Sequence, residues 1–544
     1  MSGARAGAIV VRRRDLPFLV ALLVGIAVRL VVTVAYQPAL LFPDSFGYLR
    51  HAEPLRLSLL HPEGYAVWLW PIVNLVHSTA AIAVAQHVLG LLVALVGYAF
   101  LVRRGLPGWA ATLACLPVLF DPLQLVLEQY VLSDVLFEAL LVGAAVALLW
   151  QPRPGFPAVA VAGLLVAGAT VTRGAGEVLA VVFVVALLCL RVAWTKLVAF
   201  ALAVLIPLAG YAVVFHDEFG GPYALETSGP RYLYARLAPL VRCGGVPLPA
   251  DEEPLCPTTP LRKRLPIDWY IWHGRHSPQF RVQPPAGMTQ EQLVGDFDRR
   301  VLRSEPMSYA RSVADQFAMG FSASRDAHLR GRPASRWLFH PGYWVLPLLI
   351  AHHHLRSGAT DGTADDPAAA AFLTSYGASL WTPGPLLAGL AAAALAAMLG
   401  AGRARLSGDR VAAGLLLGTC LVPLVTAAAL TGFSWRYQLP QLPLLPMAGA
   451  LGLAGLIRGA APGRVPGPLP RIPTVAVALV AVVAGAAAGA AADVSGWASS
   501  GTASAAGALV AIVVAVLLLV SRRRSGWDAV LTLPPAGPST APPR

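Results

Sequence analysis

The sequence is dominated by apolar runs about as long as a membrane-spanning helix, most of them flanked by arginine. A hydrocarbon layer ~30 Å thick is crossed by about 20 helical residues, and the helix satisfies its backbone polar groups internally. Of 544 residues, 56% are hydrophobic and only 13% are charged, whereas soluble domains have about 25% charged residues. The pattern excludes an ordinary soluble fold and predicts an all-α polytopic membrane protein.

The flanking basic residues predict the topology. We expect about twelve transmembrane helices, at residues 16–36, 79–102, 107–120, 132–150, 156–172, 177–190, 195–215, 384–400, 411–430, 437–457, 473–491 and 504–520. The basic clusters then all fall on one side of the plasma membrane, which the positive-inside rule makes the cytoplasmic side. Both termini are therefore predicted to be cytoplasmic. The net charge of +13 follows these helix ends, so we do not expect a nucleic-acid partner.

The same topology places three segments outside the cell: 37–78, 121–131 and 216–383. We expect four regions: a membrane block at 1–215 with catalytic external loops, a mixed extracytoplasmic insert at 216–383, a second membrane block at 384–520 and a disordered cytoplasmic tail at 521–544. Within the insert, the segment near 291–321 has the periodicity of an amphipathic helix.

The cysteines differ by position. Cys115, Cys189 and Cys420 lie within predicted spans, where a free thiol behaves as a small hydrophobic group. Cys243 and Cys256 lie in the insert, and outside the cytoplasm two thiols joined by a Pro/Gly-rich loop are expected to form a disulfide. A metal-binding pair is the alternative, but no Cys-x-x-Cys motif or suitably spaced histidine accompanies them.

The first external loop contains a carboxylate between aromatic residues, Asp44, just beyond the first predicted span. A carboxylate at the membrane surface can accept a proton from an acceptor hydroxyl as a general base. The alternative is structural, because Pro43-Asp44-Ser45 is also typical of a turn in which Asp44 caps a short helix.

The second external segment leads into the span at 132–150 with further acids. Asp134 and Glu138 share one helix face, and acidic side chains at the mouth of a span are costly unless they face a cavity or a partner. Glu128 precedes them in the turn. We therefore expect a polar pocket here, with helix capping by Asp134 or Ser133 as the alternative.

Most basic residues lie on the predicted cytoplasmic side. Arg173 and Arg436 are exceptions, because they lie at the outer ends of predicted hairpins. A guanidinium there can bind a lipid phosphate through paired hydrogen bonds. The alternative is contact with ordinary lipid headgroups. Arg231 and Arg236 in the insert are candidates for the same anion site, with solvated surface as their alternative.

These motifs together resemble those of the type-C glycosyltransferases (GT-C), over about residues 16–460. The likeness is to the bacterial branch that uses phospholipid carriers, akin to aminoarabinose transferases and protein O-mannosyltransferases. In chain order the matching motifs are Asp44-x-x-x-Tyr48, His61-Pro62-x-Gly64-Tyr65, Leu132-Ser133-Asp134-x-Leu136-Phe137, Thr172-Arg173-Gly174 and Arg436-Tyr437-x-x-Pro440.

The resemblance implies a GT-C-like fold with two short juxtamembrane helices in the first external loop. It implies transfer of a sugar, with inversion, from a polyprenyl-phosphate donor to a glycan, lipid or protein acceptor of the cell envelope. Asp44 matches the catalytic carboxylate and Asp134 the second acidic position. A divalent metal ion is used by some relatives and not by others. The implied substrate-binding residues are Tyr48, His61, Glu128, Arg173, Arg231, Arg236, Arg436 and Tyr437.

Two other classes fit the same helix pattern. A lipid-linked sugar transporter or flippase usually has internal repeats and ionisable residues near mid-membrane, whereas here the acids gather at the external mouth and no repeat relates the two blocks. The second class is a non-catalytic scaffold of cell-envelope assembly, which would have the same fold but would not transfer a sugar. The abundance of Ala, Gly, Pro and Arg, with little Lys or Asn, indicates a GC-rich, actinobacterial source.

Overall fold

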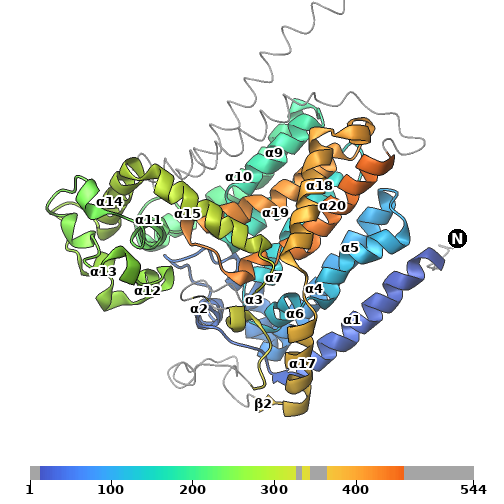
Figure 1. The fold of residues 1–544 in the computed structure, drawn as a ribbon, viewed down its shortest axis with the longest axis horizontal. Helices are drawn as coiled ribbons and strands as arrows, with labels where there is room; N and C mark the ends of the chain where they lie inside the picture. Colours follow the sequence, from blue (N-terminus) through green and yellow to red (C-terminus); the bar gives the residue numbers. More distant parts are fainter. Residues whose placement is uncertain (1–12, 326–331, 333, 343–363, 459–544) are drawn as a thin grey trace, which may run out of the picture.

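The computed structural model describes residues 13–325, 332, 334–342 and 364–458. The predicted spans at 473–491 and 504–520 and the predicted tail lie outside the described residues. Within them, every one of the other predicted spans falls on a helix (Figure 1). The long helices of the two membrane blocks are α1 (Leu16–Ala35), α4 (Thr79–Arg103), α5 (Gly108–Phe120), α7 (Asp134–Leu149), α8 (Phe156–Thr172), α9 (Leu179–Cys189), α10 (Trp194–Phe219), α18 (Gly384–Leu399), α19 (Arg410–Leu430) and α20 (Gln441–Arg458).

Shorter elements connect these helices. In the predicted first external loop are α2 (Pro43–Ala52), α3 (Gly64–Pro71) and the π-helix η2 (Ile72–Val76), and in the predicted second is α6 (Pro122–Gln129). The first loop thus contains short helices where the family resemblance implied two, and their place at the membrane surface stays a prediction. The insert contains α11 (Gly229–Leu237), α12 (Ile267–Trp272), α13 (Pro278–Arg281), α14 (Gln290–Ser304), α15 (Pro306–Ala318) and α17 (Pro367–Ser379).

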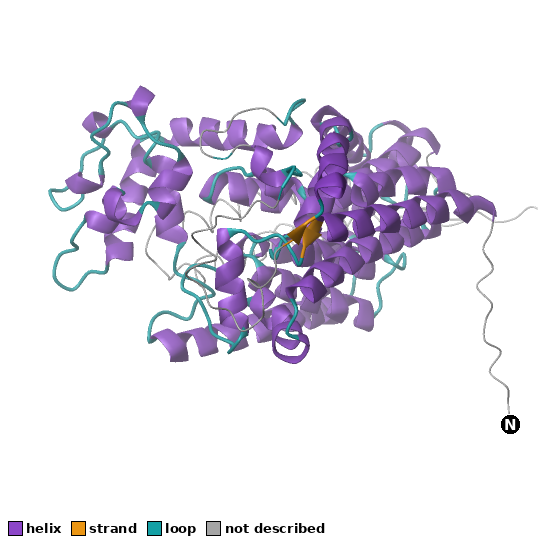
Figure 2. Ribbon diagram, turned by 90° about the horizontal axis from the view of Figure 1, so that it is seen from below, coloured by secondary structure: helices purple, strands orange, loops and turns teal. Residues whose placement is uncertain are grey.

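Helices make up most of the described chain, which confirms the predicted fold class (Figure 2). Among the described residues, five helices are long and apolar enough to cross a membrane, or up to seven if two bent helix pairs each form one span. The bent pairs are α5 with α6, at 48°, and α17 with α18, at 54°. In the described part of the insert, strand structure is limited to β2 (Ala364–Asp365), which pairs antiparallel with β1 (Tyr36–Gln37).

Local sequence explains where the long helices begin and end. The Ser78 hydroxyl accepts a hydrogen bond from the amide of Ala81 at 3.3 Å and so caps the start of α4. Helix α10 ends at Gly220, whose φ of 64° is accessible to glycine without strain. A capping residue thus marks the start of α4, and a glycine marks the end of α10.

The basic clusters that predicted the topology meet at one end of the helical bundle. Arg104 forms an ion pair with Asp409 at 2.8 Å, which joins the ends of the two blocks. Arg458 donates to the carbonyl of Gly105 at 3.4 Å. Helices α11 to α14 lie at the other end, far from the N-terminus (Figure 1). The charge pattern thus identified helix ends that share one side, and the assignment of that side to the cytoplasm stays a prediction.

The insert has a small core of its own and a separate part that packs on the membrane blocks. Helices α11, α12 and α14 enclose buried side chains that include Tyr234, Leu293 and Phe297. The predicted amphipathic segment is two helices, because Pro306 begins α15 directly after α14. Cys243 and Cys256 are joined in a disulfide with their Cα atoms 6.2 Å apart. Helix α15 packs on α19, and α17 packs on α1.

Candidate active site

Four charged side chains from separate parts of the chain meet at the end of the bundle that faces the insert. Asp44 lies in α2, Asp134 begins α7, Arg173 follows α8, and Arg436 lies in the 3₁₀ helix η11 (Trp435–Gln438). Nη1 of Arg436 lies 2.9 Å from Oδ2 of Asp44 and 4.0 Å from Oδ2 of Asp134. Arg173 donates to Oδ1 of Asp134. We call this set the acid–arginine cluster.

The backbone around Asp44 explains why its carboxylate points into the cluster. Asp44 stands in the first turn of α2, where the helix dipole favours a negative charge. The hydroxyl of Ser45 accepts the hydrogen bond from the Phe42 amide at 2.9 Å, so Asp44 makes no side-chain cap. The structure therefore excludes the alternative in which the Asp44 side chain caps a helix.

Asp134 has the same position at the start of α7 but a different environment. Neither it nor Ser133 forms a side-chain cap. Its side chain is 2% exposed, against 25% for Asp44. Oδ2 of Asp134 is buried and has no hydrogen-bond partner among the described residues. Of the two carboxylates, that of Asp44 is thus partly accessible to solvent, while that of Asp134 is buried against the arginines.

Aromatic rings enclose the two guanidinium groups. Arg436 lies 5.5 Å from the ring centroids of Tyr437 and Trp337 and 5.8 Å from that of Phe42. Arg173 lies 5.1 Å from the Tyr437 ring. Cation–π contacts stabilise a guanidinium that has lost part of its water, and they leave its edges free for hydrogen bonds. Tyr437 therefore belongs to the cluster, as the family motif implied.

Tyr48 and His61 form the layer beneath Asp44. The hydroxyl groups of Tyr48 and Ser133 lie 3.2 Å apart, and the Tyr48 and His61 rings have centroids 4.8 Å apart. Burial, and then the charge of Asp44, raise the pKa of Tyr48 well above its usual value, so the phenol stays protonated. Nδ1 of His61 lies 3.3 Å from the carboxylate of Glu63. Tyr48 and His61 thus pack next to the acid–arginine cluster.

Glu128 was predicted to bind substrate, but its side chain lies in the interior of the helical bundle. It is completely buried and pairs with Arg29 at 2.7 Å and with Nδ1 of His87 at 2.7 Å. Gln124 donates to both Glu128, at 3.1 Å, and Glu138, at 2.8 Å. These side chains form an internal network that joins α1, α4, α6 and α7. We therefore reassign Glu128 from substrate binding to helix packing, where burial requires it to be paired.

Arg231 and Arg236 also lie apart from the acid–arginine cluster. Arg231 is 3.7 Å from Glu291 and lies over the ring of Phe280 at 4.9 Å, within the insert. Arg236 is buried between α15 and the end of α19, where it donates to the carbonyl of Ala428 at 3.0 Å. The prediction that these arginines extend the same anion site is corrected: Arg231 points into the insert, and Arg236 points to the contact between the insert and α19.

Two aromatic residues of the cluster could not be recognised in the sequence. Trp337 comes from the insert and stacks over Arg436, but no motif surrounds it. Burial, and then the charges of Glu226 and Asp44, raise the pKa of Tyr232 well above its usual value. In the sequence, the charges of its neighbours Arg231 and Arg236 indicate an anion site, whereas the ring of Tyr232 gives no such signal. Among the described residues, no group of three His, Cys, Asp or Glu side chains is arranged to hold a metal ion.

Comparisons with known proteins give distant likenesses. No protein-family model matches the sequence, and no curated protein matches it. The structure is similar to the Saccharomyces cerevisiae protein O-mannosyltransferase Pmt1–Pmt2 complex bound to the sugar donor, at 15% identity and a TM-score of 0.33, over 42% of this chain and 37% of that chain. It is also similar to the apo oligosaccharyltransferase of Archaeoglobus fulgidus, at 13% identity and a TM-score of 0.38, over 91% of this chain and 56% of that one. This chain spans less than two thirds of the length of either protein.

Proposed function

We propose that this protein is a type-C glycosyltransferase that transfers a sugar from a polyprenyl-phosphate donor to an acceptor on the extracytoplasmic side of the plasma membrane. The observation that carries the proposal is the acid–arginine cluster. It combines one accessible carboxylate with two arginines at the end of a helical membrane bundle. The motif resemblance supplies the reaction class.

The two acids and the two arginines have different roles in this reaction. Asp44 accepts the proton of the acceptor hydroxyl while that oxygen attacks the anomeric carbon of the sugar. The bond from the anomeric carbon to the phosphate oxygen breaks, and polyprenyl phosphate leaves with the electron pair. Because attack and departure occur on opposite faces of the sugar, the configuration inverts.

The arginines stabilise the charge that develops on the departing phosphate. A guanidinium forms paired hydrogen bonds with a phosphate, and such preorganised donors lower the barrier most where charge appears. Nη1 of Arg436 donates to Oδ2 of Asp44 at 2.9 Å. A donor phosphate competes for the same nitrogen, so donor binding frees the Asp44 carboxylate for the acceptor. Asp134 holds Arg173 in place throughout.

Incubation of the purified protein in lipid nanodiscs with a panel of polyprenyl-phosphate sugars and envelope glycans tests the proposal. Wild-type protein should consume one donor and release polyprenyl phosphate, and Asp44→Asn should abolish this. Asp315→Asn, which changes an exposed acid of α15, is the matched control and should stay active. Full activity of a correctly folded Asp44→Asn protein would refute the mechanism.

A further inference from the structure

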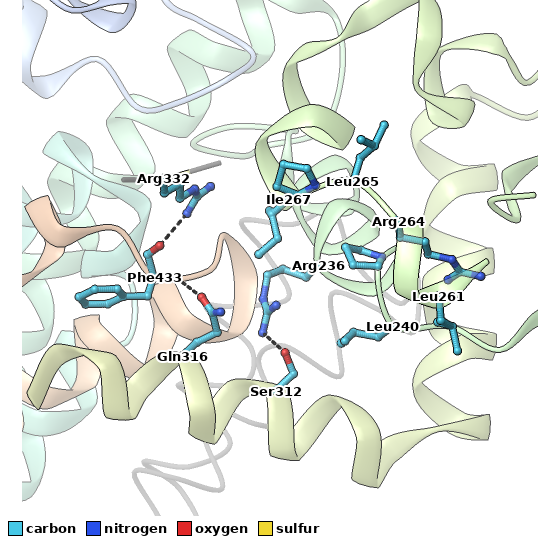
Figure 3. Close-up of a pocket in the computed structure, with 12 residues that line it drawn as sticks. Arg236, Leu240, Leu261, Arg264, Leu265, Ile267, Ser312, Gln316, Arg332 and Phe433 are labelled. Carbon is cyan, nitrogen blue, oxygen red and sulfur yellow. Dashed lines mark hydrogen bonds between the residues drawn. The ribbon is translucent and has the colours of Figure 1, made fainter. Parts of the chain in front are cut away.

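A cavity of about 230 Å³ lies between the insert and the loop after α19, apart from the acid–arginine cluster (Figure 3). Its walls come from α11, from residues 261–267, from α15 and from Phe433. The share of liquid volume that one water molecule takes is ~30 Å³, so the cavity has room for a much larger group. Three arginines line it, Arg236, Arg264 and Arg332, and no acidic residue is among the described lining residues.

Arg236 is a buried cation with only neutral partners among the described residues. Its side chain is 2% exposed, and it donates to the Ala428 carbonyl at 3.0 Å and to the Ser312 hydroxyl at 3.2 Å (Figure 3). Loss of water lowers the pKa of Arg236 to about 10. A buried charge without a counter-ion is costly, so this position favours an anion from outside the chain.

Arg264 repeats the arrangement on the opposite wall. It is 9% exposed and donates to the carbonyls of Ala238 and Val241, each at 2.6 Å, and of Thr259 at 3.1 Å. Arg332 differs because it pairs with Asp268 at 2.6 Å. Of the three positive charges in the cavity wall, only that of Arg332 is thus balanced by a described carboxylate in direct contact.

Helix capping explains part of this arrangement but not all of it. Arg236 binds a carbonyl in the last turn of α19, and Arg264 binds carbonyls just beyond α11. A helix C-terminus carries roughly half a negative charge, which offsets a full positive charge only in part. Capping also needs no cavity beside the guanidinium group, whereas one is present here.

We propose that this cavity binds an oxyanion, a phosphate or carboxylate group, carried by the acceptor. This rests on the function proposed above and names a property of its second substrate. The loop that lines the cavity links it to the cluster: Arg332 donates to the carbonyls of Gly432, at 2.9 Å, and Phe433, at 3.2 Å, and Arg436 follows three residues after Phe433. An acceptor anchored by its anion in the cavity would present its other end toward Asp44.

Binding of inorganic phosphate to the full-length protein in nanodiscs of zwitterionic lipid tests the cavity directly. Thermal unfolding is followed with phosphate or with chloride at equal ionic strength. Phosphate should stabilise the wild type, Arg436→Met and the surface control Arg242→Met. Arg236→Met should bind phosphate at least tenfold more weakly, because a charge-assisted hydrogen bond is lost. Each shift is read within one variant, so a change in basal stability does not affect it.

A second variant covers the case in which Arg236→Met fails to fold. Ser312→Glu places a carboxylate beside Arg236. This carboxylate should occupy the position of the phosphate and so abolish the stabilisation by phosphate. If the wild type shows no response, or both variants keep the full response, the arginines only cap helices and the proposal is wrong. Nanodiscs containing phosphatidylglycerol identify the source of the anion: an unchanged phosphate response supports the acceptor, and a lost response assigns the cavity to a lipid headgroup and overturns the acceptor assignment.

The same measurements separate this inference from the proposed function. Asp44→Asn should lose sugar transfer and keep the phosphate response, because the cavity and the cluster are distinct. A phosphate response in a wild-type protein that transfers no sugar would leave the oxyanion site standing and refute both the transferase proposal and the acceptor assignment that depends on it.

Discussion

Nη1 of Arg436 lies 2.9 Å from Oδ2 of Asp44, although 392 residues separate the two in sequence. The contact joins the segment that follows α1 in the first membrane block to the segment between α19 and α20 in the second. In the sequence alone, each partner has a simpler explanation, a helix cap for Asp44 and a lipid headgroup contact for Arg436. Their convergence, together with Asp134 and Arg173, is what makes a catalytic site the better interpretation.

Arg436→Met should reduce sugar transfer by roughly 100-fold or more, the usual cost of removing one donor that stabilises developing charge. Arg436→Lys should retain part of the rate, because lysine keeps the charge but loses the planar fork. Steady-state transfer rates measure both. Arg458→Met, at the opposite end of the bundle, is the control, and an unimpaired Arg436→Met enzyme would contradict the role.

Asp44→Asn and Asp134→Asn should differ in kinetics because the two carboxylates differ in exposure, 25% against 2%. Loss of the general base at Asp44 should lower kcat by about 10² to 10⁴. Asp134→Asn should lower kcat less, because Arg173 loses its ion pair but keeps its charge for the departing phosphate. Equal effects on kcat for the two variants would argue against separate roles.

Arg29→Met should destabilise the protein by ~3–5 kcal/mol, because it leaves the buried Glu128 carboxylate without its strongest partner. Denaturant unfolding measures the effect, and the double variant Arg29→Met/Glu128→Leu should recover much of the loss. The same double variant also tests the reassignment of Glu128: its protein should keep the wild-type KM for the donor, and a KM that rises tenfold would restore Glu128 to substrate binding.

Replacement of Cys243 and Cys256 by alanine should destabilise the insert by ~3 kcal/mol, the loop-closure value for a short disulfide loop. Limited proteolysis should then cut the insert first, at a lower temperature than in the wild type. Cys189→Ala, which removes a free thiol, serves as the control. Equal protease resistance of all three proteins would mean that the disulfide contributes little.

Cysteine labelling tests the predicted topology. In a background without the free cysteines, Asp217→Cys near the insert should react with a membrane-impermeant maleimide in intact cells. Arg403→Cys, at the basic end, should react only after the membrane is opened. Both positions are exposed on the described chain. The reverse pattern would place the cluster on the cytoplasmic side.

The sequence predicted the helices well because a membrane helix is a local property. An apolar run of sufficient length bounded by arginines forms a helix wherever it packs, as α4 and α19 illustrate. The basic clusters also predicted which helix ends share one side, and the Arg104–Asp409 ion pair is found there. The short motifs around Asp44, Asp134, Arg173 and Arg436 selected the residues that meet.

Tertiary structure decided which charges face one another. Glu128 and Asp134 are six positions apart, yet one turns inward to Arg29 and the other outward to Arg173. Arg236 was expected beside the lipid phosphate and instead lines a cavity under the insert. Such differences depend on how helices far apart in the chain pack together. Composition and spacing therefore determined that this is a helical membrane protein with acids and arginines at one end, while packing alone determined which of them form the site.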